Sequence, residues 1–385
     1  MTLAASIGPM GPDAPAHEPQ MVTRGSVVMM TFGAGKQIYF SASSNGGDTF
    51  SEPVKVGEGA VIPLTRHRGP RIALASGAIV ITAVTGKTLS EGPHAHGLPT
   101  DGDLIAWRST DGGKSWSKGV VVNDVPGAPT EGLHALTSDA KGNLFAAWLD
   151  KRSAKGTKLY GAHSTDGVHW SKNVLIYDSP EGTICECCHP SAAIDADGQI
   201  LVMWRNWLGG ARDMYLAKSR DGVTFTKPAK LGEGSWQLNA CPMDGGGLVV
   251  AGIQVVTAWR RGEQVFVDQP GQPETLMGAG KDVSIAASGD KIYAVWTSAG
   301  SIIAWTDGKS MEVAKAGAFP TMTSLADGGV LAAWEENGSI VTRRLAKNLA
   351  GDQTAPSGDH SPRSFAGRSA KAPWDKRRFR TRRSE

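Results

Sequence analysis

Cysteine is scarce in this sequence. The 385-residue chain has four, and three of them stand in CECCH at 185–189. Apolar runs are short, since none approaches the ~18 consecutive apolar residues that a membrane-spanning helix needs, and this excludes such a span. Residues 1–16 lack the basic start and apolar core of a secretory signal, so the chain as given shows no export signal. No long segment has apolar residues at helical spacing, which points away from a helical protein.

The composition instead indicates a globular chain with a large core. Hydrophobic residues make up 40% and charged residues 20% of the sequence. The formal net charge is only +3, and much of the positive excess lies in the last residues, DKRRFRTRRSE. We therefore expect no nucleic-acid partner for the folded part of the chain.

Glycine, at 49 residues, and regularly spaced tryptophans indicate short strands joined by tight turns. An apolar strand that ends in tryptophan recurs as NLFAAW (143–148), QILVMW (199–204), QVVTAW (254–259), KIYAVW (291–296) and GVLAAW (329–334). Two weaker copies precede them, SVVMMTF (26–32) and AIVITAV (78–84). A second strand follows each copy and a third precedes it, which gives an antiparallel meander repeated seven times.

Such a unit cannot bury both faces of its small sheet alone, and radial stacking into a β-propeller is the usual solution. The predicted fold class is therefore all-β, a single propeller of four-stranded antiparallel blades. The number of blades, six or seven, is undecided at this point, and the strand count favours seven. The sequence of unit seven shows no outer strand, so we expect the N-terminal segment to supply it.

Four turns share a sharper pattern: SSNGGDTF (43–50), STDGGKSW (109–116), STDGVHW (164–170) and SRDGVTF (219–225). An aspartate in such a turn accepts hydrogen bonds from the turn's own amides, glycine takes a positive φ, and the aromatic ring packs between strands. The residues expected in these structural roles are Asp111, Asp166, Asp221, Trp116 and Trp170. They mark the fold and not a catalytic site.

These turns resemble the Asp-box, or BNR, repeats of the sialidase superfamily. The resemblance covers roughly residues 17–348 and implies a β-propeller, six-bladed in the sialidases. It places residues 1–16 in an N-terminal extension. The remaining residues, 349–385, are rich in Pro, Ser and Arg, and we expect a disordered basic C-terminal tail.

In a propeller, the connections between blades open at one end of the central channel and the Asp-box turns at the other. CECCH leads directly into the innermost strand of unit four, and Cys241 stands at the equivalent position of unit five. We therefore expect Cys241 to meet Cys185, Cys187 and Cys188 between two neighbouring blades, with His189 facing the same cavity.

Four interpretations of this cluster are open, and one of them is a set of inert or redox-active thiols without a metal or a disulfide. A disulfide from Cys241 would tie the two blades together in an oxidising compartment. Thiolates, with or without His189, would suit Cu(I) or Zn(II). A c-type haem attachment at 185–189 is disfavoured, because the motif occurs once and no helical cytochrome-like domain surrounds it.

The same end of the channel is expected to carry other polar residues. Segments such as RHRGPRIAL (66–74), LDKR (149–152) and RNWLGGARD (205–213) lead into or connect the inner strands there. Together they predict a basic mouth that attracts an anionic glycan or a small anionic ligand. The candidate substrate-binding residues are Arg68, Arg71, Arg152, Arg205, Arg212 and Asp213. Further polar residues on this face are Glu131, His134, His94 and His96.

Sialidase activity is one function that the resemblance implies. It requires three arginines for the substrate carboxylate and a tyrosine nucleophile paired with a glutamate. GPRIA at 69–73 is similar to the segment that begins a sialidase active site, which carries over Arg71 alone. Tyr39, Tyr215 and Tyr293 stand in strand patterns, so no nucleophile is assigned and the question of an enzyme stays open.

The chain also resembles a bacterial branch of sialidase-like proteins with C-x-C-C before one blade and C-P before the next. That resemblance implies an extracytoplasmic protein. Two functions therefore compete: a glycoside hydrolase or glycan-binding protein that uses the basic mouth, and a metal-binding (Cu or Zn) or redox propeller that uses the cysteines. Metal analysis of the purified protein would separate them.

Overall fold

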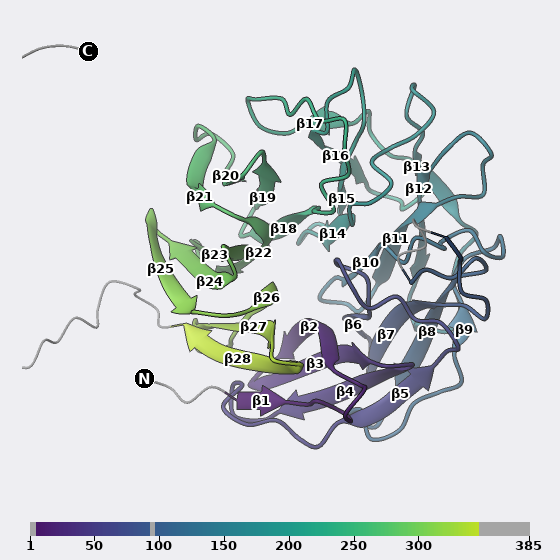
Figure 1. Ribbon diagram of the computed structural model, residues 1–385, viewed down its shortest axis with the longest axis vertical. Coiled ribbons are helices and arrows are strands. Elements are labelled where there is room, and N and C mark those ends of the chain that lie inside the picture. The colour runs from purple at the N-terminus through teal and green to yellow at the C-terminus, as the bar shows by residue number, and fades with distance from the viewer. Residues whose placement is uncertain (1–4, 93–96, 346–385) are drawn as a thin grey trace, which may run out of the picture. The chain divides into compact units, whose positions relative to one another are not determined.

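The computed structural model describes residues 5–92 and 97–345. Within these ranges the chain is all β-strand, without a helix, and forms seven four-stranded antiparallel sheets. The sheets stand side by side around a central channel as the blades of one propeller (Figure 1). The predicted fold class is confirmed, and the number of blades is seven. His94, His96 and the tail predicted over 349–385 lie outside the described residues.

The blades follow one another along the chain. Blade 1 contains β2 (Ala16–Arg24), β3 (Val27–Ala34), β4 (Gln37–Ser43) and β5 (Val54–Glu58). Blade 2 contains β6 (Arg71–Ala75), β7 (Ala78–Thr85), β8 (Asp103–Ser109) and β9 (Val120–Val121). Blade 3 contains β10 (His134–Ser138), β11 (Leu144–Asp150), β12 (Lys158–Ser164) and β13 (Val174–Tyr177).

Blade 4 contains β14 (Ser191–Ile194), β15 (Ile200–Arg205), β16 (Met214–Ser219) and β17 (Ala229–Lys230). Blade 5 contains β18 (Gly246–Ala251), β19 (Gln254–Arg261), β20 (Gln264–Asp268) and β21 (Thr275–Ala279). Blade 6 contains β22 (Lys281–Ser288), β23 (Lys291–Ser298), β24 (Ser301–Thr306) and β25 (Lys309–Ala314). Blade 7 contains β26 (Ala318–Ser324), β27 (Val330–Glu336), β28 (Ser339–Leu345) and β1 (Ala5–Ile7).

Blade 7 closes the ring. Its outermost strand is β1, which pairs antiparallel with β28 in a register that sets Ile7 opposite Ile340. The strand expected from the N-terminal segment is thus present. Both Ile7 and Ile340 are buried, in a cluster with Phe32 of blade 1.

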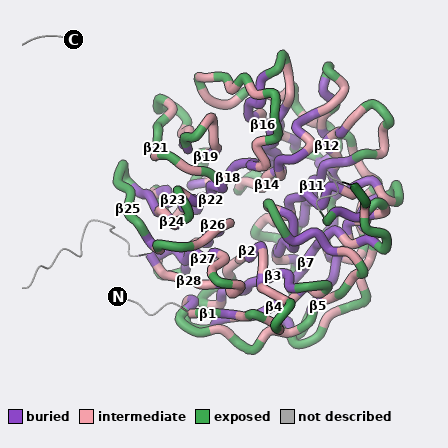
Figure 2. Tube along the Cα trace, viewed as in Figure 1, coloured by how far each residue is buried: buried purple, intermediate pink, exposed green. Residues whose placement is uncertain are grey.

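The second strand of each blade is buried on both faces, which explains its continuous apolar sequence. All seven residues of β11 are buried, and Trp148, Trp204 and Trp296 are among the largest fully buried side chains. The buried core therefore follows the middle strands, while the outer strands are exposed (Figure 2). Seven apolar clusters lie between neighbouring blades, one at each contact around the ring.

The four predicted turns each join the third strand of a blade to the fourth. Asp111 Oδ1 accepts hydrogen bonds from the amides of Lys114 and Ser115, at 3.0 Å each. Equivalent bonds reach Asp166 and Asp221 from their own turns. In an antiparallel meander these turns lie at the end of the sheet opposite the connections between blades. They are therefore remote from the residues that lead into the innermost strands.

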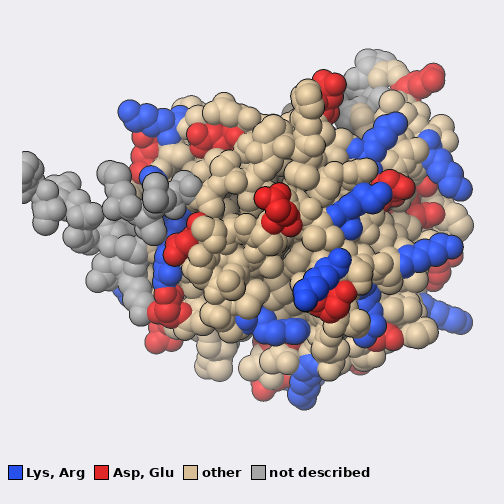
Figure 3. Space-filling model, turned by 90° about the horizontal axis from the view of Figure 1, so that it is seen from below, with Lys and Arg blue, Asp and Glu red and all other residues tan. Residues whose placement is uncertain are grey.

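Among the described residues, no helix is long and apolar enough to cross a membrane. On the face shown in Figure 3, Lys and Arg side chains are interspersed with Asp and Glu.

Candidate functional site at the channel mouth

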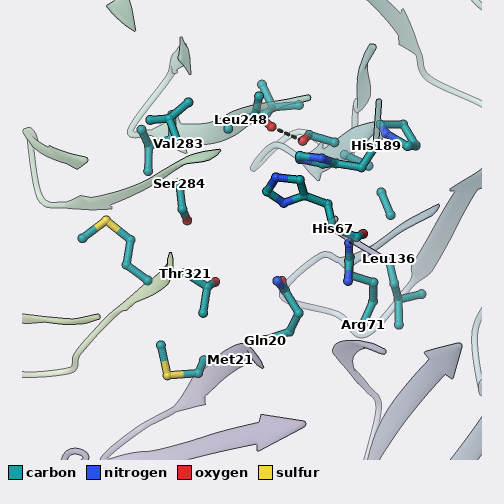
Figure 4. A pocket seen from close by; sticks show the side chains of 18 of the residues that line it. Gln20, Met21, His67, Arg71, Leu136, His189, Leu248, Val283, Ser284 and Thr321 are labelled. Carbon is teal, nitrogen blue, oxygen red and sulfur yellow. Dashed lines mark hydrogen bonds between the residues drawn. The ribbon is translucent and has the colours of Figure 1, made fainter. Parts of the chain in front are cut away.

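The innermost strands of all seven blades surround a cavity of about 280 Å³ in the central channel. The polar residues Gln20, Ser191, Ser284 and Thr321 line it among a larger number of apolar residues (Figure 4). His67, Arg71 and His189 are the ionisable residues in this lining, and they lie near one another in the view. The site is therefore built where the connections between blades enter the sheet.

Four blades begin their innermost strand in the same way. A polar residue lines the cavity, and the residue two positions earlier contacts His67. The earlier residues are Glu18, His189, Asp282 and Phe319. Three of them, Glu18, Asp282 and Phe319, have left-handed φ values of 53°, 61° and 48°, and the strand register shifts at each. Such bulges redirect a side chain and are common beside functional sites.

His67 is the centre to which these residues converge. Its Nε2 is 2.9 Å from Asp282 Oδ1, and its backbone amide donates to Glu18 Oε1 at 2.7 Å. Its ring lies 4.4 Å from the ring of His189 and 5.3 Å from that of Phe319, centroid to centroid. His67 itself has φ 66°, and its carbonyl accepts a 2.6 Å hydrogen bond from Arg71 Nη2. The loop before β6 is thus held over the channel by contacts from several blades.

The charges around His67 favour its protonated form. Burial lowers the pKa of His67, but the hydrogen bond to Asp282 and the charges of Asp282 and Glu18 outweigh it, and the pKa rises above 6.5. For Asp282, burial raises the pKa, yet the hydrogen bond and charge of His67 prevail and lower it. These two residues therefore form an ion pair on the channel side.

Glu18 is a second titratable group beside the pair. Burial raises the pKa of its carboxyl from 4.5 to about 7, although the charges of His67 and Arg71 oppose the change. Its amide donates to Glu335 Oε1 at 2.8 Å, so a strand of blade 7 fixes its backbone. A carboxyl with such a pKa exchanges its proton near neutral pH.

Asp244 completes the cluster from the loop before β18. Its side chain is buried, and its Oδ2 accepts from the amide of Asp282 at 3.1 Å, while Oδ1 has no hydrogen-bond partner. Burial and the charge of Asp282 raise the pKa of Asp244. One ligand atom from each of His67, Asp244 and Asp282 lies within 4.8 Å of the others, so the three can share a proton or a cation.

Arg71 is the one predicted arginine that lines the cavity. Burial lowers the pKa of its guanidinium, and the carboxylate of Glu18 counteracts this. Arg71 also donates to the carbonyl of Pro70 at 3.0 Å. GPRIA thus places a positive charge at the site, next to the loop that carries His67.

The other predicted candidates have structural contacts away from this cavity. Arg205 is buried and donates to the carbonyls of Asp244 and Arg212 at 3.0 and 2.7 Å. Arg68 is also buried and donates to the carbonyl of Glu131 at 2.6 Å.

Arg152 and Asp213 bind neighbours in their own blades. Arg152 pairs with Asp150 at 2.8 Å and lies over the ring of Tyr160. Asp213 accepts from Trp236 N at 2.8 Å. The arginines of the predicted basic mouth are therefore dispersed over several blades.

None of the chain's five tyrosines lines the cavity. His134 is buried, with Nε2 2.9 Å from Thr82 Oγ1, and burial lowers its pKa to about 3. It is therefore a neutral structural histidine of blade 3.

Three of the four cysteines directly precede His189 in the sequence. Cys185, Cys187 and Cys188 are buried free thiols, and Cys241 is an exposed one. We expected His189 to face the same cavity as the cysteines. Its ring instead lines the channel cavity against His67.

Sequence reasoning missed Glu18, Asp244 and Asp282. The signal available for two of them was a short repeat at the start of the innermost strands, EPQ (18–20), HPS (189–191), DVS (282–284) and FPT (319–321). This three-residue repeat is recognisable only after the seven units have been aligned by their tryptophan strands.

No family model matches the chain, and neither does any curated protein. Its fold is similar to that of an α-L-arabinanase from Penicillium chrysogenum, at 14% identity, TM-score 0.53, and 88% and 96% coverage of the two chains. It is similar to a leech intramolecular trans-sialidase, at 12% identity, TM-score 0.51, and 86% and 68% coverage. A PL25 ulvan lyase gives 11% identity, TM-score 0.52, and 87% and 94% coverage. The similarity is one of fold.

Proposed function

We propose that the protein is a glycan-processing enzyme that binds its substrate at the channel mouth, with His67 as the proton donor. The observation that carries this proposal is that His67, whose pKa is raised, lines the cavity while Asp282 holds its other side. The similar folds of an arabinanase, a trans-sialidase and an ulvan lyase support a carbohydrate as substrate.

Each residue has a part in this proposal. Because Nε2 of His67 is bound to Asp282, the Nδ1–H of the imidazolium is the donor left for a substrate oxygen. It protonates the glycosidic oxygen as the C–O bond breaks. In hydrolysis, water adds to the anomeric carbon and releases a proton, which restores the imidazolium. Arg71 supplies a positive charge for an acidic group of the glycan.

A sialidase of the tyrosine type is the less favoured form of this proposal. The cavity offers one arginine, Arg71, and no tyrosine. The acid–base group at His67 supports cleavage without such a nucleophile. A location outside the cytoplasm, implied by the sequence resemblance, belongs to the same proposal and can be checked by cell fractionation.

The test is a screen of wild-type protein and His67→Asn against sialyllactose, arabinan and ulvan. We expect wild type to cleave at least one glycan and His67→Asn to lose about 100-fold or more of that rate, the usual contribution of a general acid. His163, exposed on β12, provides the control variant His163→Asn, which should keep the rate. A new reducing end without near-ultraviolet absorbance indicates hydrolysis, whereas an unsaturated uronate indicates elimination.

Two results would contradict the proposal. Equal rates for wild type and His67→Asn would remove His67 from the chemistry. Tight binding of a glycan without turnover, unchanged in His67→Asn, would make the protein a glycan-binding propeller instead.

A further inference from the structure

The four cysteines are brought together by two connections that lead into neighbouring blades. Cys185, Cys187 and Cys188 lie between β13 and β14, and Cys241 lies between β17 and β18. Cys185 Sγ is 3.3 Å from Cys188 Sγ and 3.8 Å from Cys187 Sγ. The thiol of Cys241 interacts with that of Cys187. The sulfurs of Cys185, Cys187 and Cys188 therefore form a compact group within 4.8 Å, and Cys241 adjoins it through Cys187.

We propose that Cys185, Cys187, Cys188 and Cys241 form a four-sulfur site for a thiophilic d¹⁰ cation, Zn(II) or Cu(I). Zinc–thiolate bonds of about 2.3 Å in a tetrahedron separate the sulfurs by about 3.8 Å. The observed separations of 3.3 and 3.8 Å are close to this value. A disulfide needs about 2.05 Å, and all four cysteines are free thiols, so their sulfurs are available as ligands.

The surroundings supply the charge that such a site needs. Four thiolates and a divalent zinc, or three thiolates and Cu(I), carry a net charge of about −2. Arg212 Nη1 donates to Cys185 Sγ at 3.2 Å, and its Nε donates to the carbonyl of Leu238 at 3.4 Å. Arg212 thus links the cysteine cluster to the loop that carries Cys241. Such outer contacts orient ligands and strengthen metal binding.

The thiol at the centre of these contacts is also the most acidic. Hydrogen bonds from Cys187 and Cys188, with the charges of Arg205 and Arg212, lower the pKa of Cys185 well below 9.0. The hydrogen bond from Cys187 lowers the pKa of Cys241 to about 7. Thiolates are the form that binds soft metals. The pKa values of Cys187 and Cys188 are raised by the same cluster and by burial, so the site rests on the sulfur geometry and not on thiol acidity.

Substitution of Met243 can distinguish Cu(I) binding from Zn(II) binding. Its side chain packs against the three buried cysteines. A thioether is a ligand for Cu(I) but not for Zn(II), so Met243→Leu should weaken Cu(I) binding and leave Zn(II) binding unchanged. This variant keeps the size and apolar character of the side chain, which makes it a matched control for zinc.

The experiment uses the full chain purified under reducing conditions without chelator. Elemental analysis should find about one Zn or Cu per chain, the number of ions that one four-sulfur site holds. The metal-free protein is then titrated with Zn(II) or Cu(I) against a competing chelator, and with Co(II), whose absorption reports tetrahedral thiolate ligation. Metal should protect all four thiols from a thiol reagent.

Two substitutions test the ligands and their support. Cys241→Ser, at an exposed position, should weaken metal binding by more than about 100-fold. Arg212→Met should weaken it by about 10- to 100-fold. Circular dichroism and the melting temperature confirm that each variant is folded.

Three outcomes would overturn the proposal. If the folded chain binds neither cation and all four thiols react with the reagent, the cysteines form a thiol cluster without a metal site. A chain purified in parallel without reductant that has two reactive thiols, and four after reduction, has a disulfide. Uptake that Cys241→Ser leaves unchanged excludes Cys241 from the ligands and overturns the four-sulfur site. None of these results depends on glycan cleavage, so this proposal and the proposed function fail separately.

Discussion

The rings of His67 and His189 lie 4.4 Å apart, centroid to centroid, and their pKa values move in opposite directions. That of His67 is raised through Asp282 and Glu18. Burial, with the charges of His67 and Arg71, lowers the pKa of His189 well below 6.5. The channel mouth therefore holds an imidazolium against a neutral imidazole.

An NMR titration of the imidazole resonances checks this difference. One resonance should titrate above 6.5 and disappear in His67→Asn, while the resonance absent from His189→Asn should stay in its neutral form down to acidic pH. Two histidines that titrate together near 6.5 would contradict the assignment.

Glu18 should make the free energy of unfolding depend on pH. The pKa of its carboxyl is about 7 in the folded chain, whereas the ordinary value, which we take for the unfolded chain, is 4.5. The folded state therefore holds the proton more tightly. Stability that comes from this proton is present below pH 4.5 and is lost as the pH rises through 7. Glu18→Gln, which mimics the protonated form, should gain up to about 3 kcal/mol relative to wild type between pH 4.5 and 8.

Denaturant unfolding of both proteins across this pH range measures the effect. Glu312→Gln, on the exposed strand β25, is the control and should show no such gain. A constant difference between Glu18→Gln and wild type would show that the pKa of Glu18 is the same in the folded and the unfolded protein.

The fold could be predicted because each blade repeats its pattern locally. The strands that end at Trp148, Trp204 and Trp296 are buried on both faces, and this appears in the sequence as continuous apolar runs. The turn aspartates bind amides only two to four residues away, so their pattern is also local.

The candidate site could not be predicted in the same way. His67 and Asp244 come from the connections before β6 and β18, Asp282 comes from the start of β22, and no sequence period relates the three. Arg205 looked like a free charge, but a buried guanidinium must satisfy its donors, and it does so with backbone carbonyls. The cysteines could be grouped because their loops occupy equivalent positions in adjacent units.

Two adjacent glycines in one turn test how closely the blades pack. Gly112 and Gly113 have φ values of 79° and 89°. A Cβ on Gly112 would contact nothing within 4 Å, whereas one on Gly113 would lie 2.1 Å from the Phe40 ring of blade 1. Gly112→Ala should cost about 1–2 kcal/mol for the backbone alone. Gly113→Ala should cost about 1–3 kcal/mol more.

Thermal unfolding midpoints of the two variants give the comparison. Because the backbone cost is similar in both variants, the difference between their unfolding midpoints measures the contact with Phe40. Equal midpoints would mean that blades 1 and 2 separate easily at this turn.

Arg205→Met should destabilise the propeller strongly. The substitution leaves the carbonyls of Asp244, Arg212 and Arg260 without their donor, and each buried polar group left unsatisfied costs about 1–3 kcal/mol. Arg220→Met, on an exposed turn, should change stability by less than about 0.5 kcal/mol. Denaturant midpoints measure both. A stable Arg205→Met that has lost only ligand binding would return Arg205 to the substrate-binding residues.

The pairing of β1 with β28 also sets the order in which the molecule can be completed. Blade 7 takes Ala5–Ile7 from one part of the chain and residues 318–345 from the other. Blades 1 to 6 can each form from consecutive residues as they leave the ribosome, but the last blade must wait until Leu345 has been made. Closing this longest loop costs the most chain entropy of any blade. Until then, β1 has no partner strand. The apolar faces of blades 1 and 6 that pack against blade 7 are also uncovered and can make non-native contacts.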